Sequence, residues 1–194
     1  TFGELVGRIL RVGVVIYAAR ILKADGFGVF SYAMGLAALF TIFSDVGLSG
    51  VLIREGAKNP EEREKYFSTS FVLKIILLII SFLIVMLGAP HFTKIPLSTD
   101  LLLFVTLLLL FDSLRGFGVS LFRATEKMEI EAISNILTQG IILIAGILIL
   151  KFSPSPEHLA LSYVLGSAAG LLFVLIYLWP FFKKFWRNFD KNLV

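Results

Sequence analysis

Apolar residues dominate six stretches of this sequence, each long enough to cross a lipid bilayer as a helix. A bilayer core of about 30 Å needs roughly 20 apolar residues in helical conformation, because backbone N–H and C=O groups find no water there. The stretches lie at residues 5–22, 27–48, 66–87, 101–121, 130–150 and 159–182. The pattern predicts an all-α, polytopic membrane protein, a bundle of six transmembrane helices.

Short polar segments separate these stretches and carry residues that end helices. Four contain glycine or proline: residues 23–26, 59–62, 88–90 and 153–156. Asn59 and Pro60 are the cap and the first-turn proline expected where a helix begins. The alternating charges of residues 54–65 run on into the third stretch, which predicts a short surface helix that bends into the membrane. Residues 123–131 have a similar composition, and both segments are interpreted as solvated linkers.

Composition supports a membrane protein and excludes several other classes. Of the 194 residues, 57% are hydrophobic and 16% are charged, whereas soluble domains average about 45–50% and about 25%. The net charge is +4, but the sequence has no stripe of basic residues with aromatic residues interleaved, so no nucleic-acid partner is expected. The chain has no cysteine, only His91 and His158 as histidines, and no phosphate-binding glycine loop. We therefore expect no enzyme activity, no cofactor and no metal site.

The distribution of basic residues predicts the orientation. Loops rich in Lys and Arg stay in the cytoplasm, and all but four of the 18 basic residues fall on one predicted side. The four exceptions are Arg20, Lys23, Lys94 and Lys151. A multi-pass protein of the cell membrane with both termini in the cytoplasm is therefore expected. Trp179 and Trp186 lie where the last span would leave the bilayer, as interfacial aromatic residues do.

A few charges lie inside the apolar stretches, where they are costly unless they face protein or water. Arg8 and Arg11 are three residues apart and share one helix face, and Asp112 and Arg115 are spaced to form an ion pair. Arg20 lies at the opposite membrane surface, where a snorkelling arginine is the simpler interpretation. Lys74 is close enough to its surface to snorkel and is not counted as a site.

Three short motifs resemble those of a known family. Residues 19–33, with Arg20 and Gly28, resemble the turn between the first two helices of polysaccharide-transporter-type flippases of lipid-linked oligosaccharides, although Lys23 and Ala24 replace the usual Gly and Pro. The segment Asp45-Val46-Gly47-Leu48, followed by Arg54-Glu55, is similar to the end of that family's second helix. Residues 123–127 are similar to its polar turn between helices four and five. These flippases belong to the multidrug, oligosaccharidyl-lipid and polysaccharide exporter superfamily.

The resemblance implies a two-lobed exporter of which this chain is the N-terminal lobe. Six helices make one lobe, so residues 1–182 would form it and residues 183–194 a basic cytoplasmic tail or inter-lobe linker. The first residue is Thr1 rather than methionine, and we expect a longer parent chain whose C-terminal lobe completes the path. The other implied partners are membrane lipid and a lipid-linked oligosaccharide, which would be flipped by alternating access.

On this resemblance, the intramembrane charges acquire candidate roles. Arg8, Arg11 and Arg115 are candidates for attracting the diphosphate of a polyprenyl-linked sugar, because the guanidinium fork suits phosphate oxygens. The competing interpretation makes Asp112 and Arg115 a structural ion pair. Asp45 is expected to cap or pair near its helix end, with ion coupling as the alternative. An antiporter of drugs or metabolites from the same superfamily, and a non-transporting scaffold for glycan assembly, remain open alternatives.

Two pairs of glycines have the four-residue spacing that allows close helix contact in lipid. Gly3 and Gly7 form one pair, and Gly166 and Gly170 form the other. We interpret both as packing within the lobe rather than as dimerisation faces.

Overall fold

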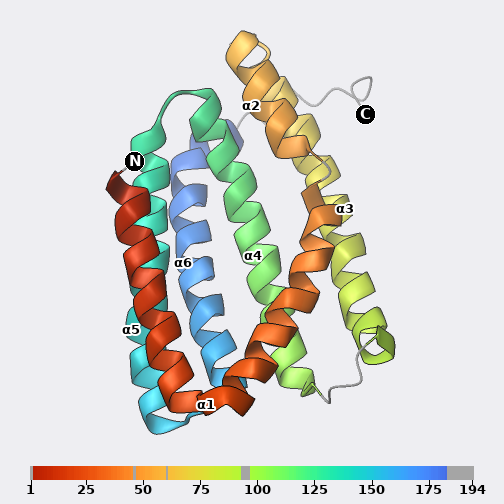
Figure 1. The fold of residues 1–194 in the computed structure, drawn as a ribbon. Helices are drawn as coiled ribbons and strands as arrows, with labels where there is room; N and C mark the ends of the chain where they lie inside the picture. Colours follow the sequence, from red (N-terminus) through yellow and green to blue (C-terminus); the bar gives the residue numbers. More distant parts are fainter. Residues whose placement is uncertain (1, 46, 60, 93–96, 183–194) are drawn as a thin grey trace.

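A computed structural model describes residues 2–45, 47–59, 61–92 and 97–182, and this part of the chain is all-α (Figure 1). Its six helices are α1 (Phe2–Asp45), α2 (Leu48–Lys58), α3 (Arg63–Phe92), α4 (Thr99–Ala124), α5 (Met128–Phe152) and α6 (Pro156–Phe182). Five of them are long and form a bundle, while α2 is short and continues beyond the end of α1 (Figure 1). Helix α1 begins, and α6 ends, at the same end of the bundle (Figure 1).

Helix α1 contains a sharp kink at Lys23, which coincides with the first predicted break. Lys23 has φ 59° and ψ −173°, a backbone conformation that residues other than glycine rarely adopt. The kink reverses the chain, so that residues 2–22 run beside α5 and residues 24–45 lean towards α3 (Figure 1). Lys23 stands where the resembling flippases usually have glycine, the residue that this conformation favours.

Four helical segments in the described part of the chain are long and apolar enough to cross a membrane. They are Lys65–Gly88, Thr99–Ala124, Met128–Phe152 and Pro156–Trp179, and they coincide with four of the six predicted spans. The two other predicted spans, 5–22 and 27–48, fall on the two halves of α1, which are not among these four segments. The all-α prediction is confirmed, and the four apolar helices support a membrane protein, but six spans are not supported among the described residues.

The structure corrects two predicted boundaries. The charged segment 54–65 does not run on into the third span, because α2 ends at Lys58 and α3 begins at Arg63, with the break predicted at residues 59–62 between them. Asn59 precedes a proline in the sequence, and such a residue is disfavoured in the α conformation. The break expected at residues 88–90 is also wrong, since α3 continues to Phe92. Membrane helices tolerate a proline where one lost hydrogen bond is accommodated locally.

Small residues bring α6 against α5, as predicted from the second glycine pair. A Cβ on Gly166 would lie 2.3 Å from Cγ1 of Ile142, and one on Gly170 would lie 2.0 Å from Oγ1 of Thr138. In the first pair, a Cβ on Gly3 would lie 2.5 Å from Cβ of Ala132 in α5. The glycine pairs therefore pack within the chain.

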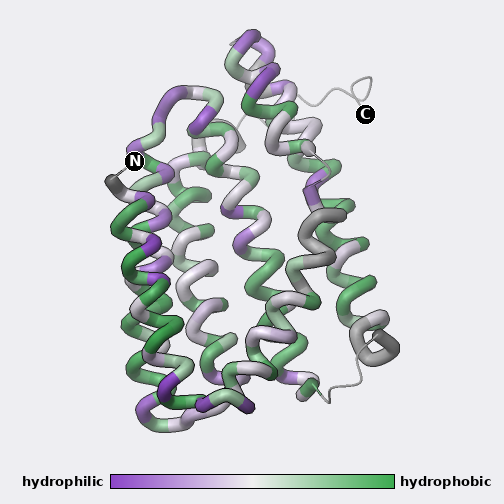
Figure 2. The backbone as a smooth tube through the Cα atoms, in the orientation of Figure 1, coloured by the Kyte–Doolittle hydropathy of each residue, from purple (hydrophilic) through white to green (hydrophobic). Residues whose placement is uncertain are grey.

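The outside of the bundle is apolar, while polar residues gather in particular places. Figure 2 shows hydrophobic residues along most of the helices, with hydrophilic bands at both ends of the bundle and part-way along α4. Many large aliphatic side chains are exposed, among them Ile79, Ile80 and Leu87 on α3. Such a surface suits lipid, whereas the hydrophilic band on α4 needs polar partners inside the bundle.

Candidate functional site

A polar cavity of about 450 Å³ lies between α1, α2, α3, α4 and α5. This volume is within the range of ligand-binding pockets, about 300–1,000 Å³. Below, it is called the polar cavity. It is lined by Ser44 and Asp45 of α1, Ser49 of α2, Lys74 of α3, Leu109, Asp112, Ser113, Arg115, Gly116, Phe117, Val119, Ser120 and Arg123 of α4, and Glu131 and Asn135 of α5.

Lys74 connects α3 to the end of α1 inside this cavity. The residue is 1% exposed, and its Nζ donates to Oδ1 of Asp45 at 3.0 Å. The hydroxyl of Ser49 donates to the same carboxylate oxygen at 2.7 Å. The prediction that Lys74 snorkels to the membrane surface is therefore wrong, because Asp45 supplies a counter-charge within the bundle. The local pairing expected for Asp45 is present in its bond with Ser49.

Arg115 is held by two partners on two helices. Its Nη2 and Nε donate to Oδ1 of Asp112 at 2.8 and 3.2 Å, which confirms the pair predicted from their spacing. Its Nη1 donates to Oδ1 of Asn135 on α5 at 2.8 Å. The Arg115 side chain is only 13% exposed, whereas that of Asp112 is 53% exposed. Arg115 thus joins α4 to α5 and lines the polar cavity.

A second arginine makes a parallel connection eight residues further along α4. Arg123 donates through Nε to Oε2 of Glu131 at 2.8 Å, and its Nη2 bonds Oε1 of the same carboxylate. Glu131 is buried, although it lies in the first turn of α5. The segment 123–131, interpreted from its composition as a solvated linker, therefore contributes a bidentate ion pair to the cavity wall.

The other predicted residues lie outside the polar cavity. Arg8 and Arg11 are exposed on the first half of α1 and do not line it, so the structure does not place them beside Arg115. Arg20 and Gly28 lie on either side of the kink, and both are exposed. Arg54 is exposed on α2, where its Nε is 3.5 Å from Oε1 of the neighbouring Glu55. Among the described residues, no group of three or more acidic or histidine side chains is placed to hold a metal ion.

Sequence comparison assigns the chain to a family along its entire length. The family model described as "Polysaccharide biosynthesis protein" matches residues 1–194. The chain belongs to this family. No curated protein and no solved structure matches the sequence significantly. Membership in the polysaccharide biosynthesis protein family, together with the four long apolar helices, makes this a membrane protein of polysaccharide synthesis or transport.

One of the motifs that suggested this family has a clear structural basis. Gly47 has φ 82°, a left-handed conformation that turns the chain between α1 and α2. Glycine adopts it without strain. The turn places Asp45 at the end of α1 and Ser49 in the first turn of α2, four residues apart, where they hydrogen-bond. The motif thus builds one corner of the polar cavity.

The lining charges of this family member balance one another. Three acidic residues (Asp45, Asp112, Glu131) face three basic residues (Lys74, Arg115, Arg123), each in an ion pair. A bound anion would therefore have to compete with a carboxylate for an arginine.

Sequence reasoning missed Lys74, Arg123, Asn135 and Glu131 as cavity residues. One signal was available for Lys74: on α3 it lies seven residues before Ser81, so the two polar residues share one face of an apolar helix. Both are buried. Asn135 and Glu131 gave no comparable signal, because their role depends on which helix lies opposite α5.

Proposed function

We propose that this chain is one lobe of an exporter that flips a polyprenyl-diphosphate-linked oligosaccharide across the cell membrane. The observation that carries the proposal is the polar, charge-lined cavity of about 450 Å³ among helices whose outer surface is apolar. A head group in such a cavity avoids hydrocarbon during transfer. Family membership in polysaccharide biosynthesis agrees with a glycan as the cargo.

An adjacent apolar cavity supports an amphipathic substrate. It measures about 130 Å³ and shares Phe117 with the polar cavity; its other lining residues are Phe67, Phe71, Leu114, Gly118, Leu171, Val174, Leu175 and Leu178. A lipid-linked sugar presents polar and apolar groups side by side, as these two cavities do.

The proposed mechanism is alternating access by this lobe and a second lobe. The two halves of α1 would serve as the first two of six spans, and the gathering of basic residues at one end would keep both termini in the cytoplasm. Rocking against the partner lobe would expose the polar cavity to one side of the membrane and then to the other. An ion gradient would drive the cycle. This role involves no chemical step.

Arg115 is the residue we propose to contact the diphosphate, by exchanging Asp112 for phosphate oxygens. Arg8 and Arg11 lie on an exposed face of α1, from which they would act at the surface between the lobes. The two partners of the ion pair then have opposite predicted effects. Asp112→Asn should lower the apparent KM for the glycolipid, because Arg115 loses its competitor, whereas Arg115→Ala should raise it.

Glycolipid translocation by the full-length protein in vesicles tests this assignment. A charged hydrogen bond contributes about 1.5–3 kcal/mol, so Arg115→Ala should reduce transport roughly 10- to 100-fold. Arg54→Ala, on the exposed surface of α2, is the matched control. Unchanged transport by Arg115→Ala at normal expression rejects the assignment, as does an increase of KM in Asp112→Asn.

The charge balance gives a second candidate function specific support. A cavity with equal numbers of acidic and basic residues suits a drug or metabolite antiporter, in which the Asp45–Lys74 pair would respond to the coupling ion. Transport of a small zwitterion with no effect of glycolipid would favour it. A non-transporting scaffold fits the local pairing of the charges but leaves the polar cavity without a role.

A further inference from the structure

Two arginines of α4 hydrogen-bond to α5 beside the polar cavity, but their ion pairs have opposite surroundings. In the Arg123–Glu131 pair the carboxylate side chain is only 11% exposed, while the arginine is 48% exposed. In the Arg115–Asp112 pair the arginine is only 13% exposed, while the carboxylate is 53% exposed. The two pairs therefore differ in which partner would lack water if they separated.

This difference decides which arginine an anion can reach. The Nε and Nη2 of Arg123 occupy both oxygens of Glu131, so an incoming anion would leave a buried carboxylate without its cation, which is costly. Asp112 is held through one oxygen, Oδ1, and is already exposed. Exposed ion pairs are weak, so an anion can replace Asp112 at Arg115 at much lower cost.

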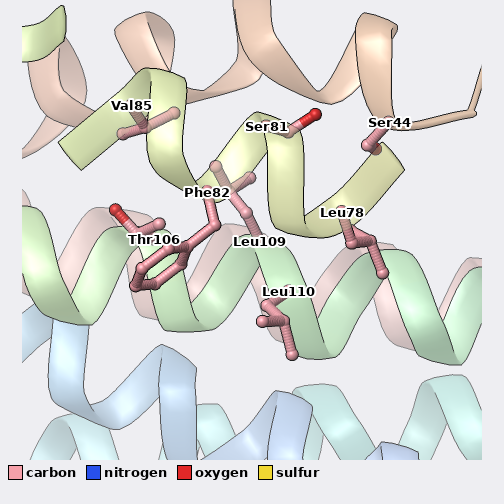
Figure 3. Close-up of a pocket in the computed structure, with 8 residues that line it drawn as sticks. All are labelled: Ser44, Leu78, Ser81, Phe82, Val85, Thr106, Leu109 and Leu110. Atoms are coloured by element: carbon pink, nitrogen blue, oxygen red, sulfur yellow. The ribbon is translucent and has the colours of Figure 1, made fainter. Parts of the chain in front are cut away.

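The third basic residue of the polar cavity, Lys74, is enclosed. It is 1% exposed and bound to Asp45. A small cavity beside the same helices shares Ser44 and Leu109 as lining residues, but it has room for only about 20 Å³. Figure 3 shows Phe82 and Leu109 among the side chains that line it. A space for one water takes about 10–15 Å³, so a phosphate group does not fit there.

Two contacts hold Arg115 in place independently of Asp112. Its Nη1 donates to Oδ1 of Asn135 at 2.8 Å, and Asn135 is half-buried on α5. A guanidinium has only donors, so the amide meets it through its oxygen. Further back along the side chain, Cδ of Arg115 passes so close to Gly170 of α6 that a Cβ there would lie 2.9 Å away. Both contacts are with uncharged groups, so they fix the side chain and leave its charge uncompensated.

We infer that Asn135 is a positioning residue for an anion site at Arg115: its neutral amide aims the guanidinium and leaves the positive charge for the ligand. The ligand class is a phosphate or diphosphate oxyanion, which exchanges with Asp112. The inference rests on the proposed function, in which Arg115 contacts the diphosphate. It adds a role for the amide on α5, which distinguishes Arg115 from Arg123 with its carboxylate partner.

Binding of inorganic pyrophosphate to the purified full-length protein, measured by calorimetry, tests this role. Asn135→Asp keeps the shape of the side chain but gives Arg115 a second, half-buried carboxylate. Pyrophosphate should then bind about tenfold more weakly or worse, because the charge of the arginine is already satisfied. If Asn135 only links α4 to α5, a carboxylate serves at least as well as an amide, and pyrophosphate binding stays unchanged. Unchanged binding therefore overturns the inference.

The matched control moves a negative charge instead of adding one. The double variant Asp112→Asn, Asn135→Asp has the net charge of the unmodified protein, but its carboxylate lies on the half-buried side of Arg115. It should bind pyrophosphate about tenfold more weakly than the unmodified protein. Asp112→Asn alone should bind it up to about fivefold more tightly. Equal binding by the double variant and the unmodified protein would show that the position of the charge is irrelevant, which overturns the inference.

Two further variants keep the test decisive. If Asn135→Asp does not fold, Asn135→Leu removes the acceptor and leaves the charge of Arg115; pyrophosphate should bind about three- to tenfold more weakly, and unchanged binding overturns the inference. Arg115→Ala separates this inference from the proposed function. If Arg115→Ala loses pyrophosphate binding while Asn135→Asp retains it, only the role of Asn135 fails. If Arg115→Ala also retains it, the assignment of Arg115 fails as well.

Discussion

Two interfaces of this bundle solve the problem of packing helices in lipid in opposite ways. Between α5 and α6, Gly166 and Gly170 let the backbones approach so closely that a Cβ would overlap Ile142 or Thr138. Between α1, α3 and α4, Lys74 and Asp45 form an ion pair beside two cavities. The first interface is closed by contact, and the second leaves room for polar groups and solvent.

The difference indicates a division of roles within the chain. Lipid provides no hydrophobic drive for helix association, so close packing of small residues must hold such a bundle together. A rigid α5–α6 pair can then support Asn135 and Glu131, which hold the two arginines of α4. Polar groups are tolerated in the interface of α1, α3 and α4, the open side, because the α5–α6 interface, the packed side, already supplies stability.

The largest expected loss of stability comes from a substitution that disrupts the packed side. In Gly170→Leu the side chain would collide with Thr138 and with Cδ of Arg115, which a Cβ alone would approach to 2.9 Å. Overpacking costs about 1–3 kcal/mol and occasionally more, so the melting temperature in detergent should fall by about 5–10 °C. Gly140→Leu is the control, since no atom lies within 4 Å of a Cβ there. Equal melting temperatures for the two variants would contradict the close contact.

The next effect concerns the ion pair on the open side. Lys74→Met keeps the volume of the side chain but leaves Asp45 without its cation. Breaking a fully buried pair costs about 3–5 kcal/mol; with the Asp45 side chain 37% exposed, we expect about 2 kcal/mol, or a melting temperature lower by about 4–8 °C. Adding Asp45→Asn should recover about half of the loss. No recovery would mean that the pair contributes nothing to stability.

The sequence predicted the packed side better than the open side. Four of the six helix spans, the glycine contacts and the Asp112–Arg115 pair follow from spacing along a single helix, and the structure contains them. The polar cavity does not follow in this way, because it depends on residues from five helices. Lys74 illustrates the limit: its distance from the membrane surface allowed snorkelling, and only the position of α1 shows that Asp45 is nearer.

Helix ends were the least predictable part of the fold. A glycine–proline segment at 88–90 suggested a break that α3 does not make, while a lysine at position 23 occupies a backbone conformation that favours glycine. In both cases tertiary context overrides local preference. The kink at Lys23 joins the half of α1 that packs on α5 to the half that lines the polar cavity, so it links the two interfaces.

A smaller, stabilising effect is therefore expected from a substitution at the Lys23 kink. Lys23→Gly should remove about 1 kcal/mol of backbone strain, because glycine adopts φ 59° without steric conflict. The melting temperature should rise by about 2–4 °C. Lys23→Ala is the control: it removes the charge but keeps the Cβ, and should give no such rise. A rise in Lys23→Ala equal to that in Lys23→Gly would assign the effect to the charge instead.

The smallest effect is expected at Arg54, which lies outside both interfaces. Its side chain is 74% exposed, and its contact with Glu55 is a surface ion pair of the kind worth about 0–1 kcal/mol. At the middle of that range, about 0.5 kcal/mol, Arg54→Ala should lower the melting temperature by about 1–2 °C. Glu55 also lies 3.7 Å from Lys58, so its charge keeps a partner in the variant. A larger loss of stability would show that α2 is docked more firmly than its exposure indicates, and the open side would then be more rigid than the comparison with the α5–α6 pair suggests.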